Sequence, residues 1–495
     1  MSGENSAQQT KYQRLMQRKG EIIRKAVGID YEQFESGSIA FDYEEMMRSV
    51  GYGLDEIRSI QGETGVGNTP LLELRNITKL ARRYAPSGKG ARIFLKDEAS
   101  NPSGSFKARR AAVSVYHAQK LGYKGVIAAT SGNYGAAVAS QAAMRGLDCI
   151  VVQECYDSRG VGQPEIVEKG RKCEAYGAEV LQLSVGPELF FVFLQLLEET
   201  GYFNASLYTP FGIAGIETLG AELSDQMRSR TGRDPDAVVV TNAGGGNLTG
   251  TARGMLKNGV ALSKGPGGSE VGGAAAGGTK VVGASVNLEG LNMAGDRQFN
   301  RKSFTTGHTG FGIPFAVFPD RSDVPRSAGR PLRYMDRYVT VRQGEVFYMT
   351  EALARLEGLE RGPAGNTALA AAFALAQEMD RDQTIVVQET EYTGAGKHVQ
   401  PQLDFARQNG IDIRLGDPRE EVPGDSIILP AEPGLITAVD LDLEQLSRSY
   451  VKRSREFTRE QGREVRDDAY DIRFLLEETR RSEAWVTHAL QELEE

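Results

Sequence analysis

Lys107 follows a short polar turn at the predicted start of a helix, a position from which a lysine can do covalent chemistry. The turn is Asn-Pro-Ser-Gly at residues 101–104, and Phe106 puts an aromatic ring directly before the amine. An amine that is held on a rigid turn and partly removed from water loses its proton near neutral pH, as a lysine that forms a Schiff base must. The alternative is a solvated lysine in the first turn of a helix, and this segment alone does not exclude it.

A second candidate is the loop TSGNYG, residues 130–135, between the predicted strand GVIAAT and a predicted helix. Backbone N–H groups at a helix N-terminus bind a carboxylate, and the Thr130 and Ser131 hydroxyls add donors. The Asn133 amide is placed to reach a phenolic or carbonyl oxygen. A plain helix cap is the alternative interpretation of this loop.

Three consecutive glycines begin the loop GGGNLTG, residues 244–250, after the apolar strand DAVVVTNA. Backbone N–H groups in such a nest cradle a doubly charged phosphate. The loop lacks the Lys-Ser/Thr ending of a nucleotide P-loop, and it matches GxGxxG only loosely, without an acidic residue for a ribose. The pattern therefore favours a small phosphate-bearing cofactor over ATP or NAD, with a turn required for packing as the alternative.

A further loop, ETEYTGAGKH at residues 389–398, follows the predicted strand TIVVQ. Thr393 lies on a glycine-bounded turn, where its hydroxyl can meet a ring nitrogen. Considered alone, this segment is better explained as an ordinary turn.

These loops need a framework that brings strand ends together. From residue 105 onward, strand-like and helix-like segments alternate, which predicts parallel strands, helical crossovers and an α/β fold. Such folds bind ligands where strand C-termini meet helix N-termini. We predict two three-layer domains with parallel sheets and with helical extensions at both ends of the chain. The predicted parts are an N-terminal extension (1–64), a large cofactor-binding domain (65–104 and 216–430), a small substrate-binding domain (105–215) and a charged helical tail (431–495).

Two other segments have simpler interpretations. The Gly-rich stretch 259–280 is expected to be a surface insertion, because nothing in it fixes a geometry. The last part of the tail has helical periodicity and is expected to be a solvated helix. Its alternative role is a docking stripe made of Leu476, Val486, Leu490 and Leu493.

The composition excludes several classes of function. The 495 residues are 40% hydrophobic and 25% charged, with a formal net charge of −8, which argues against nucleic acid or an anionic membrane as the main partner. No apolar run approaches the roughly 20 residues of a membrane span, and the N-terminus has no signal-peptide core, so a cytoplasmic location is expected. The three cysteines show no CxxC spacing, so no metal site is predicted.

The segments SGSFKARR, TSGNYG, GGGNLTG and TGAGK occur in an order that resembles the fold type II family of pyridoxal-phosphate enzymes, over about residues 65–400. The resemblance implies that Lys107 binds the cofactor covalently, that Asn133 lies beside its phenolic oxygen, and that Thr393 faces its pyridine nitrogen. Ala108 departs from the pattern, because many relatives have an acidic residue after the lysine. The implied phosphate site is Gly244, Gly245, Gly246, Asn247 and Leu248. The implied site for a substrate carboxylate is Thr130, Ser131, Gly132, Asn133 and Tyr134.

Other segments, among them QECYDSR, SFTTGHTGFG and PLRYMDRYV, are similar to the beta subunits of thiolases that act on 2-amino-4-oxopentanoate. In that family, coenzyme A cleaves the substrate to acetyl-CoA and D-alanine in ornithine degradation, together with a small alpha subunit. The resemblance implies the same reaction here. It also implies coenzyme A as co-substrate, an alpha subunit as partner, and a homodimeric core within a hetero-oligomer.

The sequence defines the residues for the thiol chemistry less well. His308 is the candidate for activating the thiol or polarising the ketone, with loop structuring as the alternative. Cys155 is a candidate acyl carrier, although a small apolar side chain at a strand end is the favoured interpretation. Candidates to bind the phosphates of coenzyme A are Arg321, Arg326, Arg330 and Arg333, with the alpha subunit as the alternative source of this surface. Such arginines are more often plain surface residues.

Two other functions are compatible with these motifs. A threonine-synthase-like or ammonia-lyase enzyme would act on β or γ leaving groups and release pyruvate or 2-oxobutanoate without coenzyme A. A cofactor-loaded scaffold subunit would bind a partner and catalyse no reaction. The intact lysine and the phosphate loop argue against the scaffold.

Overall fold

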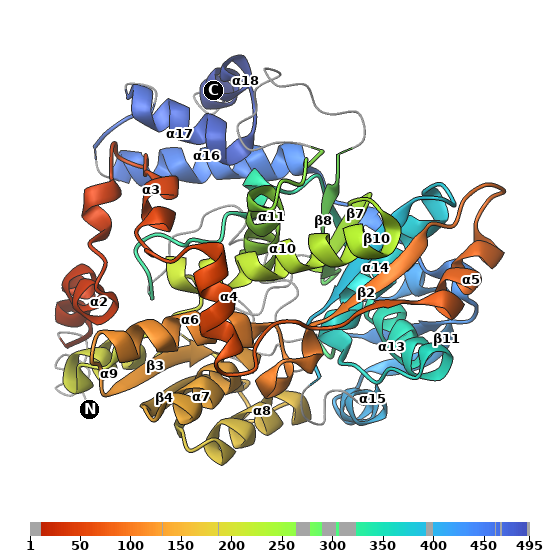
Figure 1. The fold of residues 1–495 in the computed structure, drawn as a ribbon, viewed down its shortest axis with the longest axis horizontal. Helices are drawn as coiled ribbons and strands as arrows, with labels where there is room; N and C mark the ends of the chain where they lie inside the picture. The colour runs from red at the N-terminus through yellow and green to blue at the C-terminus, as the bar shows by residue number, and fades with distance from the viewer. Residues whose placement is uncertain are drawn as a thin grey trace.

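Two β-sheets built mainly of parallel strands form the framework of the protein in a computed structural model of the chain (Figure 1). The Gly-rich stretch expected as a surface insertion falls largely outside the described residues, in 264–277. The structure describes residues 11–130, 132–186, 188–263, 278–289, 303–305, 323–392, 399–460, 462–465 and 468–492.

The smaller sheet has four parallel strands in the order β5-β4-β3-β6. Strand β3 (Gly125–Thr130) is buried along its whole length, as expected for an uncharged run that is covered by helices on both faces. The other strands are β4 (Asp148–Tyr156), β5 (Glu179–Ser184) and β6 (Phe203–Asn204). The helices in this part of the chain are α6 (Lys107–Lys120), α7 (Asn133–Arg145), α8 (Pro164–Ala175) and α9 (Glu188–Thr200).

The larger sheet has seven strands in the order β1-β2-β10-β7-β8-β9-β13. The five inner strands run parallel, whereas the edge strands β1 and β13 pair antiparallel with their neighbours. The strands are β1 (Leu71–Glu73), β2 (Arg92–Asp97), β7 (Ala237–Thr241), β8 (Lys280–Val286), β9 (Arg337–Val341), β10 (Thr384–Glu389) and β13 (Val439–Asp440). The helices around them are α5 (Arg75–Tyr84), α10 (Pro210–Thr231), α11 (Gly246–Lys257), α13 (Gln343–Glu357) and α14 (Pro363–Glu378).

A small parallel pair of strands, β11 (Asp412–Gly416) and β12 (Ser426–Pro430), follows helix α15 (Val399–Gln408). Before the sheets, the N-terminal extension forms α2 (Lys19–Val27), α3 (Tyr43–Arg48) and α4 (Leu54–Gly62). After them, the tail forms α16 (Leu443–Glu460), α17 (Ala469–Thr479) and α18 (Glu483–Glu492).

The two ends of the chain pack against each other. Figure 1 shows α16–α18 together on one side of the molecule, beside α3. The buried Asp471 carboxylate accepts hydrogen bonds from the backbone N–H groups of Ile39 (2.9 Å) and Ala40 (2.8 Å). Val486 and Leu490 are buried in the same hydrophobic core. Leu476 packs against this core as well, and Leu493 lies outside the described residues, so the described part of the apolar stripe packs within the chain.

The structure confirms the predicted α/β architecture and its parallel sheets. All strands of the smaller sheet fall within residues 105–215, and those of the larger sheet lie before and after that segment, while the domain boundaries themselves stay predictions. The prediction of a helical tail was incomplete, because the tail also contributes β13, which extends the larger sheet beyond β9. A two-residue strand is too short to leave a periodic pattern in the sequence. In the described ranges, no helix has the apolar length that a bilayer requires.

Candidate functional site

Lys107 is the first residue of α6, and the end of strand β10 holds the turn before it. The backbone N–H of Phe106 donates to the Thr390 carbonyl (3.1 Å), and that of Tyr392 donates to the Gly104 carbonyl (2.8 Å). Gly104 has a left-handed φ of 73°, and a Cβ atom there would collide with the carbonyl oxygen of Tyr392. The turn therefore needs glycine at this position, and the lysine is fixed to the carboxyl edge of the larger sheet.

The Lys107 amine lies in a partly dehydrated environment. Its nitrogen is 4.7 Å from the centroid of the Phe106 ring. Burial lowers the pKa of the amine to about 8; the Glu391 carboxylate acts in the opposite direction, and the charge of Lys169 lowers the pKa further. Desolvation disfavours the charged form of a lysine, so a large neutral fraction is present in mildly alkaline solution.

This pKa predicts how the reactivity of Lys107 changes with pH. In protein freed of cofactor, an amine-acylating reagent is expected to modify Lys107 with a rate that rises through pH 8 and then levels off, because only the neutral amine reacts. Peptide mapping of the modified protein at a series of pH values measures this profile. Lys120, exposed at the other end of α6, is the internal control. A Lys107 profile that follows that of Lys120 would contradict the prediction.

A buried group of charged residues from α8 and from the segment after β10 influences the Lys107 amine. Lys169 forms ion pairs with Glu165 and with Glu391, the latter at 3.7 Å. Lys172, one turn further along α8, donates to the Ser103 carbonyl (2.8 Å) and so supports the turn. Sequence reasoning missed these residues, because their spacing in PEIVEKGRK is that of an ordinary solvated helix.

The glycine loop joins β7 to α11, as the sequence predicts. Gly245 is the N-cap with a φ of 79°, and Gly246 is the first helical residue. No acceptor among the described residues takes the backbone N–H groups of Gly246, Asn247 or Leu248. The Leu248 side chain packs in the hydrophobic core, so only its backbone is available to a ligand. Helix α11 thus presents free N–H donors at its positive end.

The TSGN loop joins β3 to α7, with Asn133 as the first helical residue. The Thr130 hydroxyl is engaged locally, since it accepts a hydrogen bond from the Gly132 N–H at 3.0 Å. The Asn133 side chain is buried, and its carbonyl oxygen has no hydrogen-bond partner among the described residues. Tyr134 is buried, and burial raises the pKa of its hydroxyl. Ser131 lies outside the described residues.

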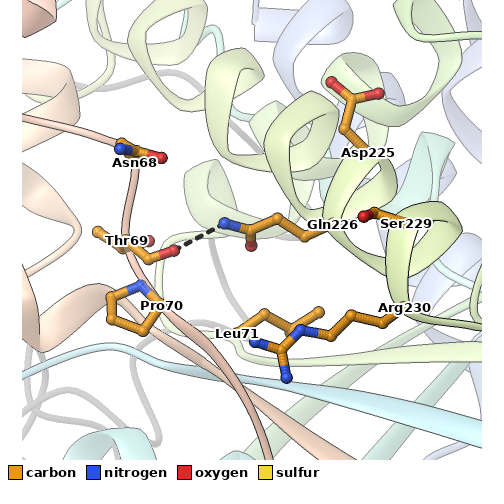
Figure 2. A pocket seen from close by; sticks show the side chains of 8 residues that line it. All are labelled: Asn68, Thr69, Pro70, Leu71, Asp225, Gln226, Ser229 and Arg230. Atoms are coloured by element: carbon orange, nitrogen blue, oxygen red, sulfur yellow. Dashed lines mark hydrogen bonds between the residues drawn. The ribbon is translucent and has the colours of Figure 1, made fainter.

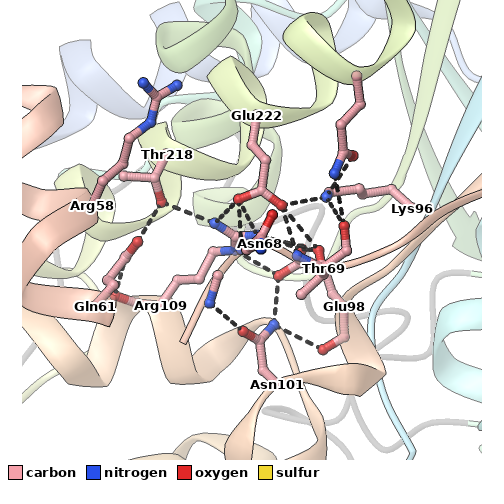
Figure 3. Close-up of polar contacts among 12 residues, drawn as sticks. Arg58, Gln61, Asn68, Thr69, Lys96, Glu98, Asn101, Arg109, Thr218 and Glu222 are labelled. Carbon is pink, nitrogen blue, oxygen red and sulfur yellow. Dashed lines mark hydrogen bonds and ion pairs between the residues drawn. The ribbon is translucent and has the colours of Figure 1, made fainter. Parts of the chain in front are cut away.

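Next to the start of the turn, a buried ion network anchors the first residues of α6 (Figure 3). Arg109 pairs with Glu98 (2.7 Å) and with Glu222 (3.1 Å), and Lys96 pairs with Glu222 (2.5 Å). Burial raises the pKa of Glu222, but the charges of Arg109 and Lys96 outweigh it and lower the value to about 2. The side chain of Asn101 donates to Glu98 (2.8 Å), so the network also holds the beginning of the turn.

A cavity of about 450 Å³ lies beside this network (Figure 2). The segment 68–71 forms one wall, and α10 forms the other through Asp225, Gln226, Ser229 and Arg230. None of the predicted site residues lines this cavity, so it is separate from the loops around Lys107.

Three further candidates from the sequence are His308, Thr393 and Cys155. His308 and Thr393 lie outside the described residues. Cys155 is fully buried in an apolar cluster, and burial raises the pKa of its thiol to about 11, so the thiolate that an acyl carrier needs is rare at neutral pH.

Of the four arginines suggested for coenzyme A, Arg321 lies outside the described residues, and the interpretation of the other three as surface residues was wrong. Arg326, Arg330 and Arg333 are no more than 8% exposed. Arg333 pairs with Glu477 at 2.9 Å, and Arg330 with Glu478 at 3.4 Å, both on α17. Arg330 and Arg333 thus bind the tail to the body of the protein, whereas Arg326 lies 4.0 Å from the Glu35 carboxylate of the N-terminal extension. The three arginines present no basic surface to coenzyme A.

The comparisons with known proteins agree with this geometry. Residues 62–391 match the model of a family described as pyridoxal-phosphate dependent enzyme. The chain belongs to this family. This pyridoxal-phosphate enzyme is also 67% identical, over 97% of its chain and 98% of the relative, to a 2-amino-4-ketopentanoate thiolase beta subunit of Acetoanaerobium sticklandii. A second relative of that name, from an unknown prokaryotic organism, is 61% identical over 98% of this chain and 99% of its own.

These similarities confirm both resemblances that the sequence suggested, to fold type II enzymes and to thiolase beta subunits. Among solved structures, that of O-ureido-L-serine synthase is similar to this chain, with a TM-score of 0.50 and 21% sequence identity. The similarity covers 68% of this chain and 91% of the synthase chain. This likeness supports the fold alone.

The side chains around Lys107 fit pyridoxal phosphate, the cofactor that the name of the family implies. Buried polar atoms are nearly always hydrogen-bonded in folded proteins. Around Lys107 and the two loops, however, several have no partner in the described part of the chain. They are the hydroxyls of Ser103 and Ser105, the Asn133 carbonyl oxygen, both amide atoms of Asn247 and the Nε atom of Arg110. Such a group of unpaired atoms fits a polar ligand that would bind among them.

Proposed function

We propose that this chain is the cofactor-bearing subunit of an enzyme that cleaves 2-amino-4-oxopentanoate, also called 2-amino-4-ketopentanoate, with coenzyme A. The products are acetyl-CoA and alanine, released as the D form as the family resemblance implies, in ornithine degradation. The observation that carries the proposal is the 67% identity to a thiolase beta subunit over nearly the whole chain. The desolvated amine of Lys107 beside unpaired polar groups supports it.

Pyridoxal phosphate, when bound, supplies an electron sink that stabilises negative charge next to the amino group of the substrate. Lys107 would hold the cofactor. Backbone N–H groups from Gly244 to Leu248 would hold its phosphate, and the Asn133 amide would contact its phenolic oxygen. The role of Thr393 at the pyridine nitrogen stays a prediction. The loop from Thr130 to Tyr134 would bind the substrate carboxylate through the N-terminus of α7.

Lys107 is the proposed proton carrier of the reaction. With a pKa near 8, its amine is able to take a proton from the substrate and to return it within the physiological range. The thiol of coenzyme A adds to the ketone carbon, and the bond between carbons 3 and 4 breaks with its electron pair going to carbon 3. A proton then adds to carbon 3, which leaves acetyl-CoA and alanine. Activation of the thiol by His308 stays a prediction.

The second component of the proposal is a partner subunit. Both relatives carry the name of a beta subunit, which supports a small alpha subunit as the partner of this chain. Arg326, Arg330 and Arg333 are engaged within the chain, so we propose that the alpha subunit supplies part of the coenzyme A site. The homodimeric core and the cytoplasmic location stay predictions.

The experiment that tests the function is an assay of acetyl-CoA formation from 2-amino-4-oxopentanoate and coenzyme A, with and without a co-expressed alpha subunit. We expect acetyl-CoA and alanine in equal amounts. Release of pyruvate or 2-oxobutanoate without coenzyme A would instead establish a lyase. A cofactor-saturated complex that is inactive with every amino acid tested would favour a scaffold.

A further inference from the structure

Arg110 is a buried cation with no carboxylate partner among the residues that the structure describes. Arg110 is 2% exposed. Among the described residues, the guanidinium makes one hydrogen bond, from Nη1 to the Leu207 carbonyl (3.0 Å), and Nε finds no acceptor there. The preceding residue, Arg109, is equally buried but is paired with two carboxylates. A buried charge without a counter-charge is strongly unfavourable, so Arg110 requires an anion.

The Arg110 guanidinium lies against the glycine loop. A Cβ atom on Gly246 would collide with Nη2 of Arg110, so the arginine touches the first residue of α11. The N–H groups of Gly246, Asn247 and Leu248 begin the same helix and have no acceptor in the described ranges. A guanidinium and a helix N-terminus therefore meet at one point, where both favour the binding of an anion.

The position of Arg110 on α6 relates this point to Lys107. Residues three apart are neighbours on a helix surface, and both side chains lie over the Phe106 ring, Lys107 at 4.7 Å and Arg110 at 5.7 Å from its centroid. One face of α6 thus presents an amine and, one turn later, a guanidinium. A ligand with an aldehyde at one end and a phosphate at the other matches these two groups.

We propose that Arg110 is a cofactor-positioning residue whose guanidinium pairs with the phosphate of pyridoxal phosphate and so completes the glycine nest. The proposal rests on the cofactor that the proposed function requires, but not on the substrate or on the thiolase reaction. Sequence reasoning assigned the phosphate to the loop of residues 244–248 alone, because Arg110 in SFKARR has the spacing of an unremarkable helix residue.

The test compares pyridoxal phosphate with pyridoxal, which differs from it only in lacking the phosphate. The variant Arg110→Met removes the charge and keeps the length of the side chain. We expect it to weaken equilibrium binding of pyridoxal phosphate to the cofactor-free complex by about 10- to 100-fold, the effect of one charge-assisted hydrogen bond. Binding of pyridoxal should change little, and stabilisation of the cofactor-free protein by inorganic phosphate in a thermal melt should be lost.

Two further variants make the result specific. Arg110→Lys keeps the charge without the planar fork and should bind pyridoxal phosphate with intermediate affinity. Arg145→Met is the matched control, because Arg145 is also a largely buried arginine, on α7, but is paired with Glu63; its affinity for pyridoxal phosphate should equal that of the wild type. An equal loss for both ligands in Arg110→Met, or no loss for either, would overturn the proposal.

The wild-type protein provides an independent measurement should Arg110→Met fail to fold. Pyridoxal phosphate, but not pyridoxal, should shift one arginine Nε–H resonance and slow its hydrogen exchange. An unchanged set of arginine resonances would refute the pairing. If the phosphate pairing is found in a complex that forms no acetyl-CoA, the proposed reaction fails while the role of Arg110 stands.

Discussion

Replacing Lys107 with alanine is expected to reduce acetyl-CoA formation by at least about 10²-fold, the effect of losing a positioned acid–base group. The reason lies at the start of α6, where the amine is fixed by the turn and kept near a pKa of about 8. The measurement is the turnover rate of the co-expressed complex saturated with cofactor. The absorbance of the cofactor bound to lysine should disappear in the same preparation.

Lys120→Ala is the control for this prediction, because Lys120 belongs to the same helix but is exposed at its far end. Its activity and absorbance should equal those of the wild type. A Lys107→Ala protein with normal turnover and with the absorbance retained would exclude Lys107 as the cofactor-binding base.

Removing Arg109 is expected to have the largest effect on stability. In Arg109→Met, the Glu98 carboxylate stays buried without its cationic partner, and Glu222 keeps the ion pair with Lys96 and its hydrogen bonds from backbone N–H groups. Breaking one member of a buried ion network typically costs about 3–5 kcal/mol. Unfolding by denaturant, followed by circular dichroism, measures the change in the free energy of unfolding.

The control for this second prediction is the exposed ion pair of Lys89 and Asp380, whose side chains are 38% and 62% accessible. Lys89→Met should cost no more than about 1 kcal/mol. Equal losses of unfolding free energy for Arg109→Met and Lys89→Met would show that the network adds little to stability.

Because the folded-state pKa of Glu222 is about 2, below its ordinary 4.5, the contribution of Glu222 to stability is complete above pH 4.5 and is lost as the pH falls toward 2.

The sequence predicts those parts of the site that are encoded locally. Lys107, Asn133 and Gly246 each begin a helix, where a polar or glycine-rich turn follows an apolar strand. A strand, a turn and a helix leave a pattern within about twenty residues, so their order is visible without a structure. The same holds for β3, β7 and β10, whose apolar runs are nearly free of charge.

Other parts of the site depend on contacts between distant segments. Arg110 and Lys169 have the spacing of solvated helix residues, and their burial follows only from the elements that pack over α6 and α8. Arg330 and Arg333 were interpreted as surface residues, but α17, more than a hundred residues later in the chain, covers them. The residue type alone does not show whether a charged side chain faces water or a buried carboxylate. The burial of these side chains is therefore known only from the tertiary structure.

The packing of the tail has a consequence for the order in which the protein folds during its synthesis. Strand β13 completes one edge of the larger sheet, and Asp471 accepts hydrogen bonds from the N–H groups of Ile39 and Ala40. Both β13 and Asp471 follow the other strands of the larger sheet in the chain and leave the ribosome after them. The N-terminal extension, although made before the sheets, therefore acquires its contacts with the tail only after the sheets are synthesised, and a nascent chain halted before residue 439 would expose the β9 edge to other chains.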